Sequence, residues 1–378
     1  MSSSIFNVLI LGGYGNFGAR IARSLARERR FRLIIAGRNP DKARDFCEEL
    51  RRLGPTVDVD AQRLDQMDAR LDHGIAASGA SLVIHTSGPY QGQDYRVARA
   101  CISAGVNYID LADGRDFVAG IRTLDAAARD RNVLVVSGAS TLPALSSAVV
   151  DTLKSKFSRL DVIEMSIAPG QRAERGLATL QAVLTYCGKP FRAWEGGQWR
   201  EVYGWQGMRT FRYPGLGWRA LLRCDVPDLA LFPDHYRPTR TVRFDAALEL
   251  FVAQLGFWCL SWLSRAGVIK SPERLAPAFF QIGQVMDLFG SDVGGMHVRL
   301  AGLDQTGKAL TATWFLTARS GCGPEIPSIP AVILAKKLAS QNPGLHGAQP
   351  CLSMFTLDEF NAAVRHLPIE SQVLEQHG

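Results

Sequence analysis

Short apolar runs alternate with amphipathic segments through the first part of the chain. Residues 5–11 form a short apolar run that contains one polar residue, Asn7, and the next segment places Phe17, Ile21 and Leu25 on one side of a helix with arginines on the other. Continuous apolar strands that alternate with helices are typical of a parallel sheet that is buried on both faces. The pattern therefore predicts a doubly wound α/β domain over residues 1–139.

The pattern changes after about residue 140. Residues 191–213 read as short aromatic strands broken by glycines, and residues 297–303 and 309–318 alternate apolar and polar positions around an Asp-Gln-Thr-Gly turn. Alternation with a period of two on both sides of such a turn predicts an antiparallel hairpin. Antiparallel strands after parallel ones predict a second, α+β domain over residues 140–320, for substrate binding or dimerisation.

A glycine-rich turn joins the first strand to the first helix, and it reads Gly12-Gly13-Tyr14-Gly15-Asn16-Phe17-Gly18. Gly13 would permit the tight turn, Gly15 would let a phosphate approach the backbone, and Gly18 would let the helix pack closely on its strand. In this context the spacing predicts a Rossmann-type domain that holds a dinucleotide pyrophosphate at the helix N-terminus, with Tyr14, Asn16 and Phe17 also at the cofactor. The alternative is a tight turn in another kind of α/β protein.

The residues after the second strand indicate which dinucleotide is bound. An NAD-binding unit usually offers a carboxylate to the ribose 2′-hydroxyl here, whereas this chain has Gly37-Arg38-Asn39. A guanidinium group can donate two charge-assisted hydrogen bonds to a 2′-phosphate. The sequence therefore predicts NADP as the cofactor, bound through Arg38 and Asn39. Asn39 and Pro40 also read as a helix cap, and both interpretations can hold together.

Two later loops are expected on the same edge of the sheet. Asp65 follows the third strand, where it would either reach the adenine amino group or cap the next helix. Ser87, Gly88, Pro89 and Tyr90 follow the fourth strand. They are expected to cradle the ribose and nicotinamide, and the alternative is a rigid turn that only starts a helix.

Hydride transfer also needs a proton donor or acceptor near the reacting atom. Tyr90 and Asp113 lie in the loops after the fourth and fifth predicted strands, so they are the candidate proton relays. His85 ends a buried strand and is more typical of hydrogen-bonded structure, and Asp110 is expected to anchor a loop through backbone N–H groups. The sequence contains no Ser-His-Asp order and no metal-binding set, so we predict no metal.

Composition narrows the partners and the compartment. The net charge is +7, but the basic residues are dispersed along the chain, which favours anionic small molecules and no nucleic-acid partner. The seven cysteines lack paired spacing, as expected for buried free thiols in a reducing compartment. The amino terminus has no basic segment followed by an apolar one, so we expect a cytoplasmic protein.

One uncharged segment requires a membrane test. Residues 250–264 read LFVAQLGFWCLSWLS, and Arg265 follows. As a helix they would extend about 22 Å, which is too short for a hydrocarbon core of about 30 Å. We expect a core helix or a homodimer interface here. The alternative is an interfacial helix that makes a peripheral membrane contact through Phe257, Trp258 and Trp262.

Three segments together resemble the saccharopine dehydrogenase-like oxidoreductases. They are GGYGNFGARIA at 12–22, SGPYQGQDYRVARACISAGVNYIDL at 87–111 and GCGPEIPSIPAVILAKKLA at 321–339. The resemblance implies an NAD(P)-dependent oxidoreductase whose cofactor domain is completed by residues 321–378, with a mixed-sheet α+β domain inserted between the two parts. Members often continue with a Gly-Glu pair where this chain has Ala112-Asp113-Gly114-Arg115, which leaves the substrate open.

The sequence thus predicts an NADP-dependent oxidoreductase that transfers hydride to or from a carbonyl, imine or activated alkene. The aromatic residues of 191–218 and 251–262 motivate an apolar small-molecule substrate, although they are equally typical of a dimer interface. The alternative is a non-catalytic NADP-binding or lipid-associated scaffold protein that retains the nucleotide fold. The absence of an unambiguous acid or base in the sequence favours this alternative.

Overall fold

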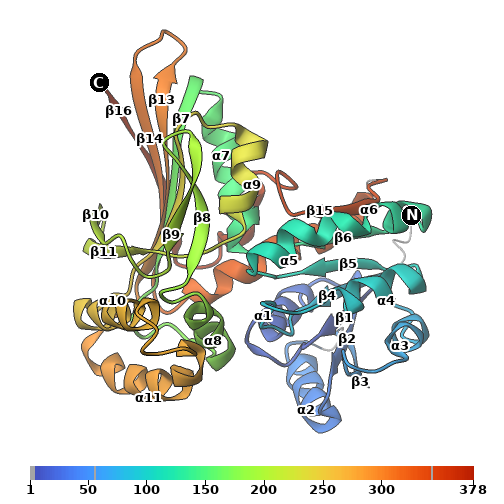
Figure 1. Cartoon of the computed structure of the whole chain (residues 1–378). Helices are drawn as coiled ribbons and strands as arrows, with labels where there is room; N and C mark the ends of the chain where they lie inside the picture. The colour runs from blue at the N-terminus through green and yellow to red at the C-terminus, as the bar shows by residue number, and fades with distance from the viewer. Residues whose placement is uncertain (1–4, 55–56, 342–343) are drawn as a thin grey trace. The chain divides into compact units, whose positions relative to one another are not determined.

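A computed structural model describes residues 5–54, 57–341 and 344–378, which form two compact units (Figure 1). Unit 1 comprises Met1–Ala144 and Glu325–Phe355, and unit 2 comprises Leu145–Pro324 and Thr356–Gly378. We predicted that all of residues 321–378 return to the first domain. The structure corrects this prediction, because only the segment that ends at Phe355 does so.

Unit 1 is built on a seven-stranded sheet in which all neighbouring strands are parallel. Across the sheet the strands are β15 (Gly347–Pro350), β6 (Leu134–Ser137), β5 (Asn107–Asp110), β4 (Leu82–His85), β1 (Phe6–Leu11), β2 (Phe31–Gly37) and β3 (Asp58–Arg63). The order reverses between β1 and β4, and the register places Leu11 beside His85. The loops after these two strands therefore begin next to each other, at the switch point where doubly wound sheets bind ligands.

Helices flank both faces of this sheet (Figure 1). They are α1 (Asn16–Leu25), α2 (Pro40–Arg51), α3 (Leu71–Ala77), α4 (Arg96–Ala104), α5 (Arg115–Gly120), α6 (Asp125–Asp130) and α12 (Ile329–Gln341). Leu71 of α3 and Cys101 of α4 join a core cluster with Leu9 of β1. The next β1 side chain, Ile10, is fully buried and points to the opposite face. Burial on both faces explains why the β1 sequence is apolar without alternation.

Unit 2 is built on a nine-stranded mixed sheet. Its main path is β10 (Arg209–Tyr213), β11 (Gly217–Arg223), β12 (Thr241–Ala246), β7 (Phe157–Ala168), β13 (Gly294–Asp304), β14 (Ala309–Ala318) and β16 (Ile369–His377), and β8 (Pro190–Glu195) joins β12 to β9 (Gln198–Tyr203). The predicted hairpin is confirmed as β13 and β14, and Asp304 Oδ1 accepts hydrogen bonds from the backbone N–H groups of Thr306 (2.8 Å) and Lys308 (2.9 Å).

The pairing of β16 explains why the carboxyl end belongs to unit 2. Nine residues of β16 pair antiparallel with β14, from Leu310↔His377 to Ala318↔Ile369. Without β16, the outer side of β14 would be a row of unpaired backbone groups. This long-range pairing therefore outweighs the expected return to unit 1.

Helices cover one face of the unit 2 sheet and extend beyond its end (Figure 1). They are α7 (Ser146–Lys154), α8 (Leu177–Thr185), α9 (Asp228–Tyr236), α10 (Phe251–Arg265), α11 (Ala276–Met286) and α13 (Leu357–Val364). The unit also contains the short 3-10 turns η3 (Pro272–Leu275) and η4 (Asp287–Phe289), and a similar turn in unit 1 is η1 (Ile121–Leu124). Ile163 and Met165 of β7 are fully buried, and α7 packs against β7 and β13. The alternate side chain Glu164 accepts hydrogen bonds from Arg209 (2.6 Å) and Arg299 (2.7 Å).

Residues 250–264 lie almost entirely within α10. Of the two expected roles, the core helix is wrong because one side of α10 is exposed, and the homodimer interface stays a prediction. Phe257 is buried, whereas Phe251, Val252 and Trp262 are exposed. The helix also exposes Cys259, so the prediction of buried thiols is wrong there, although five of the seven cysteines are buried. Within the described ranges, no helix is long and apolar enough to cross a membrane.

A buried carboxylate lies at the start of α9. Asp228 is fully buried, and Ser146 Oγ donates a hydrogen bond to its Oδ1. Among the described residues, Oδ2 has no hydrogen-bond partner. Burial raises the pKa of Asp228 to about 7, and the hydrogen bond from Ser146 opposes this rise. The negative charge is therefore costly in the folded state.

We predict that Asp228 makes unit 2 less stable as the pH rises from about 4 to about 7. In this window the folded state binds more protons than the unfolded state, so the free energy of unfolding falls with rising pH. A shift of about three pH units corresponds to roughly 4 kcal/mol. Asp228→Asn keeps an acceptor for Ser146 but carries no charge, so it should remove most of this dependence and exceed the parent protein in stability at pH 8.

All seven tryptophans lie in unit 2, between residues 194 and 314, so urea unfolding followed by tryptophan fluorescence reports on this unit. Asp234→Asn, on the exposed side of the same helix, is the matched control and should keep the pH dependence of the parent protein. An Asp228→Asn variant with the same pH dependence as the parent would contradict the prediction.

Candidate functional site

The glycine-rich turn lies between β1 and α1, at the switch point of the unit 1 sheet. Its left-handed residue is Gly12, with φ +84°, so our assignment of the tight turn to Gly13 is wrong. A Cβ on Gly12 would lie 2.6 Å from Ser87 Oγ, which shows how closely the loop after β4 approaches. A Cβ on Gly13 would lie 2.9 Å from the carbonyl oxygen of Ile10. Both positions therefore require glycine, for different reasons.

Gly18 brings the start of α1 against this turn, as predicted. A Cβ on Gly18 would overlap the carbonyl oxygen of Gly12 and lie 2.8 Å from the Cα of Gly13. Gly15 is different, because it is exposed and a Cβ there would meet the Gly12 carbonyl oxygen at 3.1 Å. Gly18 thus holds the cradle together, while Gly15 leaves its outer side open.

The N-terminus of α1 is suited to an anion. Gly15 is its N-cap, no side chain of the described residues caps it, and its first turn contains no acidic residue. Elsewhere the chain does use caps, with Asn39 at α2 and Thr356 at α13. The first N–H groups of a helix without a side-chain cap, together with the helix dipole, attract a phosphate group. The open, uncapped cradle therefore fits a dinucleotide pyrophosphate.

Tyr14 links the glycine turn to the end of β2. A Cβ on Gly37 would lie 2.5 Å from the Tyr14 hydroxyl, so the tyrosine ring lies directly over this glycine. The hydroxyl accepts a hydrogen bond from the backbone N–H of Asn39 (3.0 Å). Tyr14 thus packs the turn against the loop that carries the predicted 2′-phosphate ligand.

Asn16 and Phe17 form the first turn of α1. Arg20 Nη1 donates to the carbonyl oxygen of Asn16 (2.9 Å), and Arg20 also pairs with Glu325 of the returning segment (3.0 Å). Phe17 is half-buried, and Ser328 Oγ donates to its carbonyl oxygen at 3.5 Å. The returning segment therefore braces the start of the helix from outside the sheet.

Arg38 is exposed directly after β2, and no carboxylate among the described residues forms an ion pair with it. Its guanidinium group is therefore available to a ligand. The predicted helix cap is confirmed, because Asn39 Oδ1 accepts hydrogen bonds from the backbone N–H groups of Asp41 (3.0 Å) and Lys42 (3.1 Å). This cap occupies the side-chain oxygen of Asn39, so only the side-chain NH₂ group of Asn39 would remain for a contact with the cofactor.

Asp65 lies in the loop after β3 and is half-buried. Its Oδ1 accepts a hydrogen bond from the backbone N–H of Met67 (3.0 Å). The helix α3 begins only at Leu71, so the alternative that Asp65 caps this helix is wrong. Asp65 instead stabilises a turn in the loop.

The loop from Ser87 to Tyr90 is held between the end of β1 and the segment that precedes α4. Thr86 Oγ1 donates to the carbonyl oxygen of Leu11 (2.9 Å). Gln93 Nε2 donates to the carbonyl oxygens of Ser87 (3.0 Å) and Pro89 (2.7 Å). Gly88 and Pro89 are exposed at the top of this loop. The structure thus brings the loops after β1 and β4 together, as a site for ribose and nicotinamide requires.

Tyr90 is not placed as a proton relay, and this prediction is wrong. Its side chain is 5 % exposed, and its hydroxyl donates to the carbonyl oxygen of His85 (2.7 Å). Burial raises the pKa of Tyr90 well above its ordinary value. A buried phenol that donates to the backbone cannot exchange protons with a ligand, so Tyr90 anchors the loop.

His85 is part of the buried structure, as predicted. Burial lowers its pKa to about 3, so the ring is neutral. Nε2 lies 3.1 Å from Gln66 Oε1 and Nδ1 lies 3.0 Å from the Tyr108 hydroxyl, so both ring nitrogens have hydrogen-bond partners. The histidine therefore joins the loop after β3 to β5 without introducing a charge.

Asp110 anchors a loop through backbone N–H groups, which confirms the prediction. Its Oδ1 accepts from the backbone N–H groups of Ala112 (2.9 Å) and Gly138 (2.8 Å) and from Ser137 Oγ (2.9 Å). Burial raises the pKa of Asp110 to about 6, and these hydrogen bonds oppose the rise. Asp110 is fully buried, so it organises the loops after β5 and β6 rather than contacting a ligand.

Asp113 is the exposed carboxylate of the same edge. Gln91 Nε2 donates to its Oδ1 at 3.2 Å. Desolvation by the surrounding protein raises the pKa of Asp113, and the hydrogen bond from Gln91 opposes this rise. The residue is nevertheless exposed, so its carboxylate is available for proton exchange.

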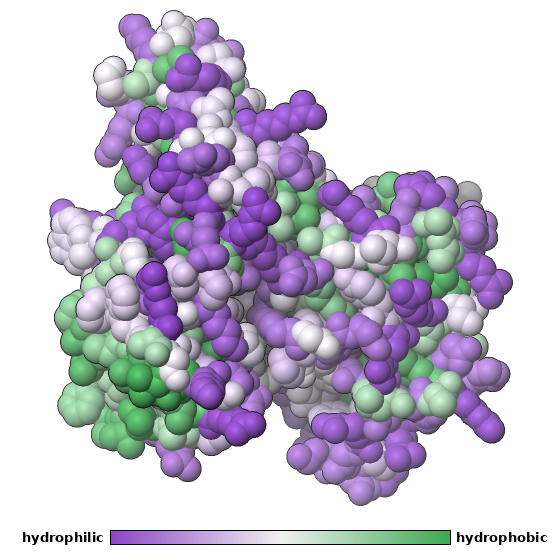
Figure 2. Space-filling model, viewed as in Figure 1, coloured by the Kyte–Doolittle hydropathy of each residue, from purple (hydrophilic) through white to green (hydrophobic). Residues whose placement is uncertain are grey.

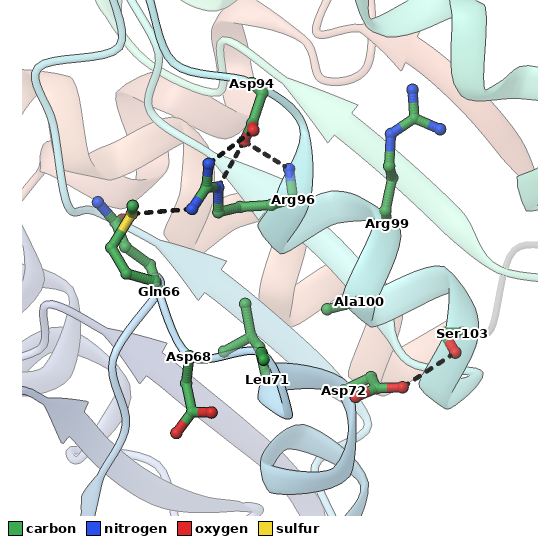
Figure 3. Close-up of a pocket in the computed structure, with 11 residues that line it drawn as sticks. Gln66, Asp68, Leu71, Asp72, Asp94, Arg96, Arg99, Ala100 and Ser103 are labelled. Carbon is green, nitrogen blue, oxygen red and sulfur yellow. Dashed lines mark hydrogen bonds and ion pairs between the residues drawn. The ribbon is translucent and has the colours of Figure 1, made fainter.

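A separate pocket of about 430 Å³ lies between the loop after β3 and the start of α4 (Figure 3). Two of its charged residues, Asp94 and Arg96, pair with each other. Arg96 Nε donates to Asp94 Oδ1 (2.7 Å), and Arg96 Nη1 lies 2.9 Å from the sulfur of Met67 (Figure 3). None of its lining residues belongs to the glycine turn or to the loop from Ser87 to Tyr90, so we do not assign the dinucleotide to it.

Comparison with known families identifies the first domain. Residues 8–142 match the family described as saccharopine dehydrogenase NADP binding domain. These residues are thus similar to the NADP binding domain of that family. They include six of the seven strands of the Rossmann-type sheet that the strand order shows.

Solved structures support the fold of the whole chain. The apo saccharopine dehydrogenase (L-Glu forming) from Saccharomyces cerevisiae is similar with a TM-score of 0.67 at 14% identity, covering 98% of this chain and 100% of that one. An amine dehydrogenase from Mycobacterium smegmatis matches with a TM-score of 0.46 at 11% identity, covering 93% of this chain and 95% of that one, and we draw no conclusion from this weaker likeness. A search of curated proteins finds no match.

Sequence reasoning missed the residues that hold the loops in place. Gly12, Thr86 and Gln93 were not among the predicted site residues. The pair Gly12-Gly13 was a usable signal, because either glycine could have the positive φ. Thr86 and Gln93 act through hydrogen bonds to backbone carbonyl oxygens, which leave no spacing pattern in the sequence.

We predict different outcomes for alanine at the two ends of the cradle. Gly18→Ala should lower the melting temperature and abolish nucleotide binding, because its Cβ overlaps the Gly12 carbonyl oxygen and the helix must move. Gly15→Ala should leave the melting temperature within about 2 °C of the parent but weaken nucleotide binding roughly tenfold or more, because its methyl group occupies the side of phosphate approach.

Thermal unfolding and NADPH titration measure the two effects. Gly54→Ala is the control, since nothing lies within 4 Å of the added Cβ. Equal loss of stability in the Gly15 and Gly18 variants would show that neither residue acts as we describe.

Proposed function

We propose that the protein is an NADP(H)-dependent oxidoreductase that transfers hydride to or from a carbonyl, imine or activated alkene of an apolar small molecule. The observation that carries the proposal is the uncapped glycine cradle at the sheet switch point, within a segment that matches an NADP-binding domain family. The cradle would hold the pyrophosphate, and the loop from Ser87 to Tyr90 would carry the ribose and nicotinamide.

The preference for NADP over NAD rests on Arg38. The residue follows β2 where an NAD-binding unit offers a carboxylate, and its exposed guanidinium group can donate two hydrogen bonds to a 2′-phosphate. The amide of Asn39 and the carboxylate of Asp65 would lie toward the adenosine end, on the loops after β2 and β3.

Arg38→Asp should weaken NADPH binding roughly 100-fold or more while changing NADH binding far less, because the carboxylate repels a 2′-phosphate and accepts from a 2′-hydroxyl. Fluorescence titration with both reduced dinucleotides measures this preference. Arg44→Asp, on the exposed side of α2, makes the same change in net charge and should leave the preference intact. An equal loss of both affinities in Arg38→Asp would contradict the assignment of NADP.

The bound dinucleotide would supply the hydride, and the chain would supply orientation and a proton. In the reducing direction the substrate carbon gains a hydride, its oxygen, nitrogen or neighbouring carbon gains a proton, and NADPH becomes NADP⁺. We propose Asp113 as the group that exchanges this proton, since it is exposed in the loop after β5 and bonded to Gln91. Proton transfer by a positioned side chain typically contributes about 10²- to 10⁴-fold to the rate.

Asp113→Asn should lower kcat roughly 100-fold and leave the dissociation constant of NADPH unchanged, because the amide keeps the hydrogen bond to Gln91 but cannot exchange the proton. The neighbouring exposed acid Asp116 provides the control variant Asp116→Asn, which should retain full activity. A kcat for Asp113→Asn equal to that of the parent would remove Asp113 from the mechanism.

The second candidate is an NADP-binding scaffold protein without turnover. It is favoured by the buried position of Tyr90, which leaves Asp113 as the one predicted relay that stays exposed among the described residues. Oxidation of NADPH in the presence of a panel of aldehydes, ketones, imines and enoyl compounds distinguishes the two functions. Tight NADPH binding without turnover on any member of the panel would favour the scaffold.

A further inference from the structure

An apolar surface covers the outer side of α10, α11 and η4, and we call it the α10–η4 surface. Its exposed large apolar residues are Phe251, Val252, Leu255, Trp262, Leu263, Val268, Ile282, Val285, Leu288 and Phe289. These are ten of the nineteen exposed large apolar residues in the described ranges, although the segment spans only residues 251–289. Figure 2 shows a continuous apolar region where Figure 1 places α10 and α11. A concentration of this kind marks an interaction surface.

The helix α10 has a mixed buried side and a largely apolar exposed side. Gln254 and Ser261 are fully buried, beside the buried Phe257 and Leu260. Gln254 bonds to the backbone through both its atoms, accepting from Leu248 N (2.7 Å) and donating to Ala246 O (3.1 Å), while Phe251 stays 61 % exposed. On a helix whose outer side faces water, the exposed residues are mostly polar and the buried residues are apolar. The outer side of α10 is therefore suited to apolar surroundings.

The two helices form one surface, and its most exposed residues lie just after α10 and in η4. The rings of Phe257 and Phe279 lie 5.3 Å apart, which joins α10 to α11. Val268 follows α10 and is 70 % exposed, while Leu288 and Phe289 in η4 are 76 % and 75 % exposed. A protein partner would need a pocket for each of these protruding side chains, whereas the fluid interior of a lipid layer accommodates them without one.

The charges beside α10 suit anionic headgroups. No acidic residue occurs between Glu249 and Glu273, and this segment contains Arg265 and Lys270. In η4 the carboxylate of Asp287 forms an ion pair with Arg175 (2.7 Å), which offsets its charge. The Arg265 guanidinium group lies 5.3 Å from the centre of the Trp262 ring. Tryptophan, arginine and lysine at the border of an apolar surface are typical of helices that lie in a membrane interface.

We propose that the α10–η4 surface docks on an anionic lipid bilayer, with α10 lying in the plane of the interface. The helix has 15 residues and does not cross the bilayer. Phe251, Leu288 and Phe289 enter the acyl boundary, and Arg265 and Lys270 remain among the headgroups. This docking is independent of nucleotide binding and of turnover.

Flotation of the full chain with vesicles tests the proposal. We expect recovery with vesicles of phosphatidylcholine and phosphatidylglycerol in equal parts, weaker recovery with phosphatidylcholine alone, and a loss at high salt. Phe289→Glu should lower the partition coefficient roughly tenfold or more, because the side chain no longer gains from burial and now carries a negative charge.

Leu53→Glu is the matched control, since Leu53 is 54 % exposed in unit 1, and it should float like the parent chain. Urea unfolding followed by tryptophan fluorescence confirms that unit 2 of Phe289→Glu is folded, and NADPH titration serves the same purpose for unit 1 of Leu53→Glu. Absence of the parent chain from the lipid fraction, or recovery that Phe289→Glu leaves unchanged, would overturn the proposal. A dimer in sedimentation velocity that Phe289→Glu dissociates, without flotation of the parent chain, would overturn it in favour of an interface between two copies.

Discussion

The carbonyl oxygen of Gly12 lies so close to the Cα of Gly18 that no side chain fits between them, and the ligand-binding edge of unit 1 depends on this contact. The contact places the start of α1 over the end of β1. Thr86 Oγ1 donates to the same carbonyl oxygen at 3.1 Å, so the loop after β4 is held at the same point. The turn, the helix N-terminus and the loop from Ser87 to Tyr90 are consequently held against one another. If a dinucleotide spans them as we propose, its phosphate and nicotinamide sites would already be aligned, which would lower the entropy cost of binding.

Near this contact, the titratable residues that hold loops in place are buried, and the one that is accessible for proton transfer is exposed. His85 and Tyr90 are buried and neutral, and both are saturated by hydrogen bonds within unit 1. Asp110 is buried as well, and its Oδ1 is occupied by the loops after β5 and β6. Asp113, three residues later, is exposed. Chemistry at this edge is therefore decided by exposure rather than by residue type, because His, Tyr and Asp are all competent acids or bases in principle.

The features that could be predicted from the sequence depend on residues close together in the chain, and those that could not depend on residues far apart in it or on backbone groups alone. Uninterrupted apolar runs and the glycine spacing depend on neighbours in the chain, so the parallel sheet, the cradle and the Asn39 cap were predictable. The partner of the Tyr90 hydroxyl is a backbone carbonyl, and any residue could supply it, so no residue type signals the bond. The return of β16 to β14 joins positions about sixty residues apart through backbone groups alone, which also leaves no mark in composition.

The segment 250–264 shows the limit of hydropathy most clearly. Its residues are apolar around most of the helix, and this pattern is equally compatible with a core helix, a subunit interface or a lipid-facing helix. The structure excludes a helix that is buried on all sides, because Gln254 and Ser261 point inward and the exposed side of α10 is largely apolar. Each apolar side chain on that side of α10 would gain free energy if it were removed from water, so a partner that covers the side would stabilise the protein. A lipid layer would serve this purpose and would also concentrate apolar substrates beside the enzyme, so that one physical property, low solubility in water, would govern both its docking and its chemistry.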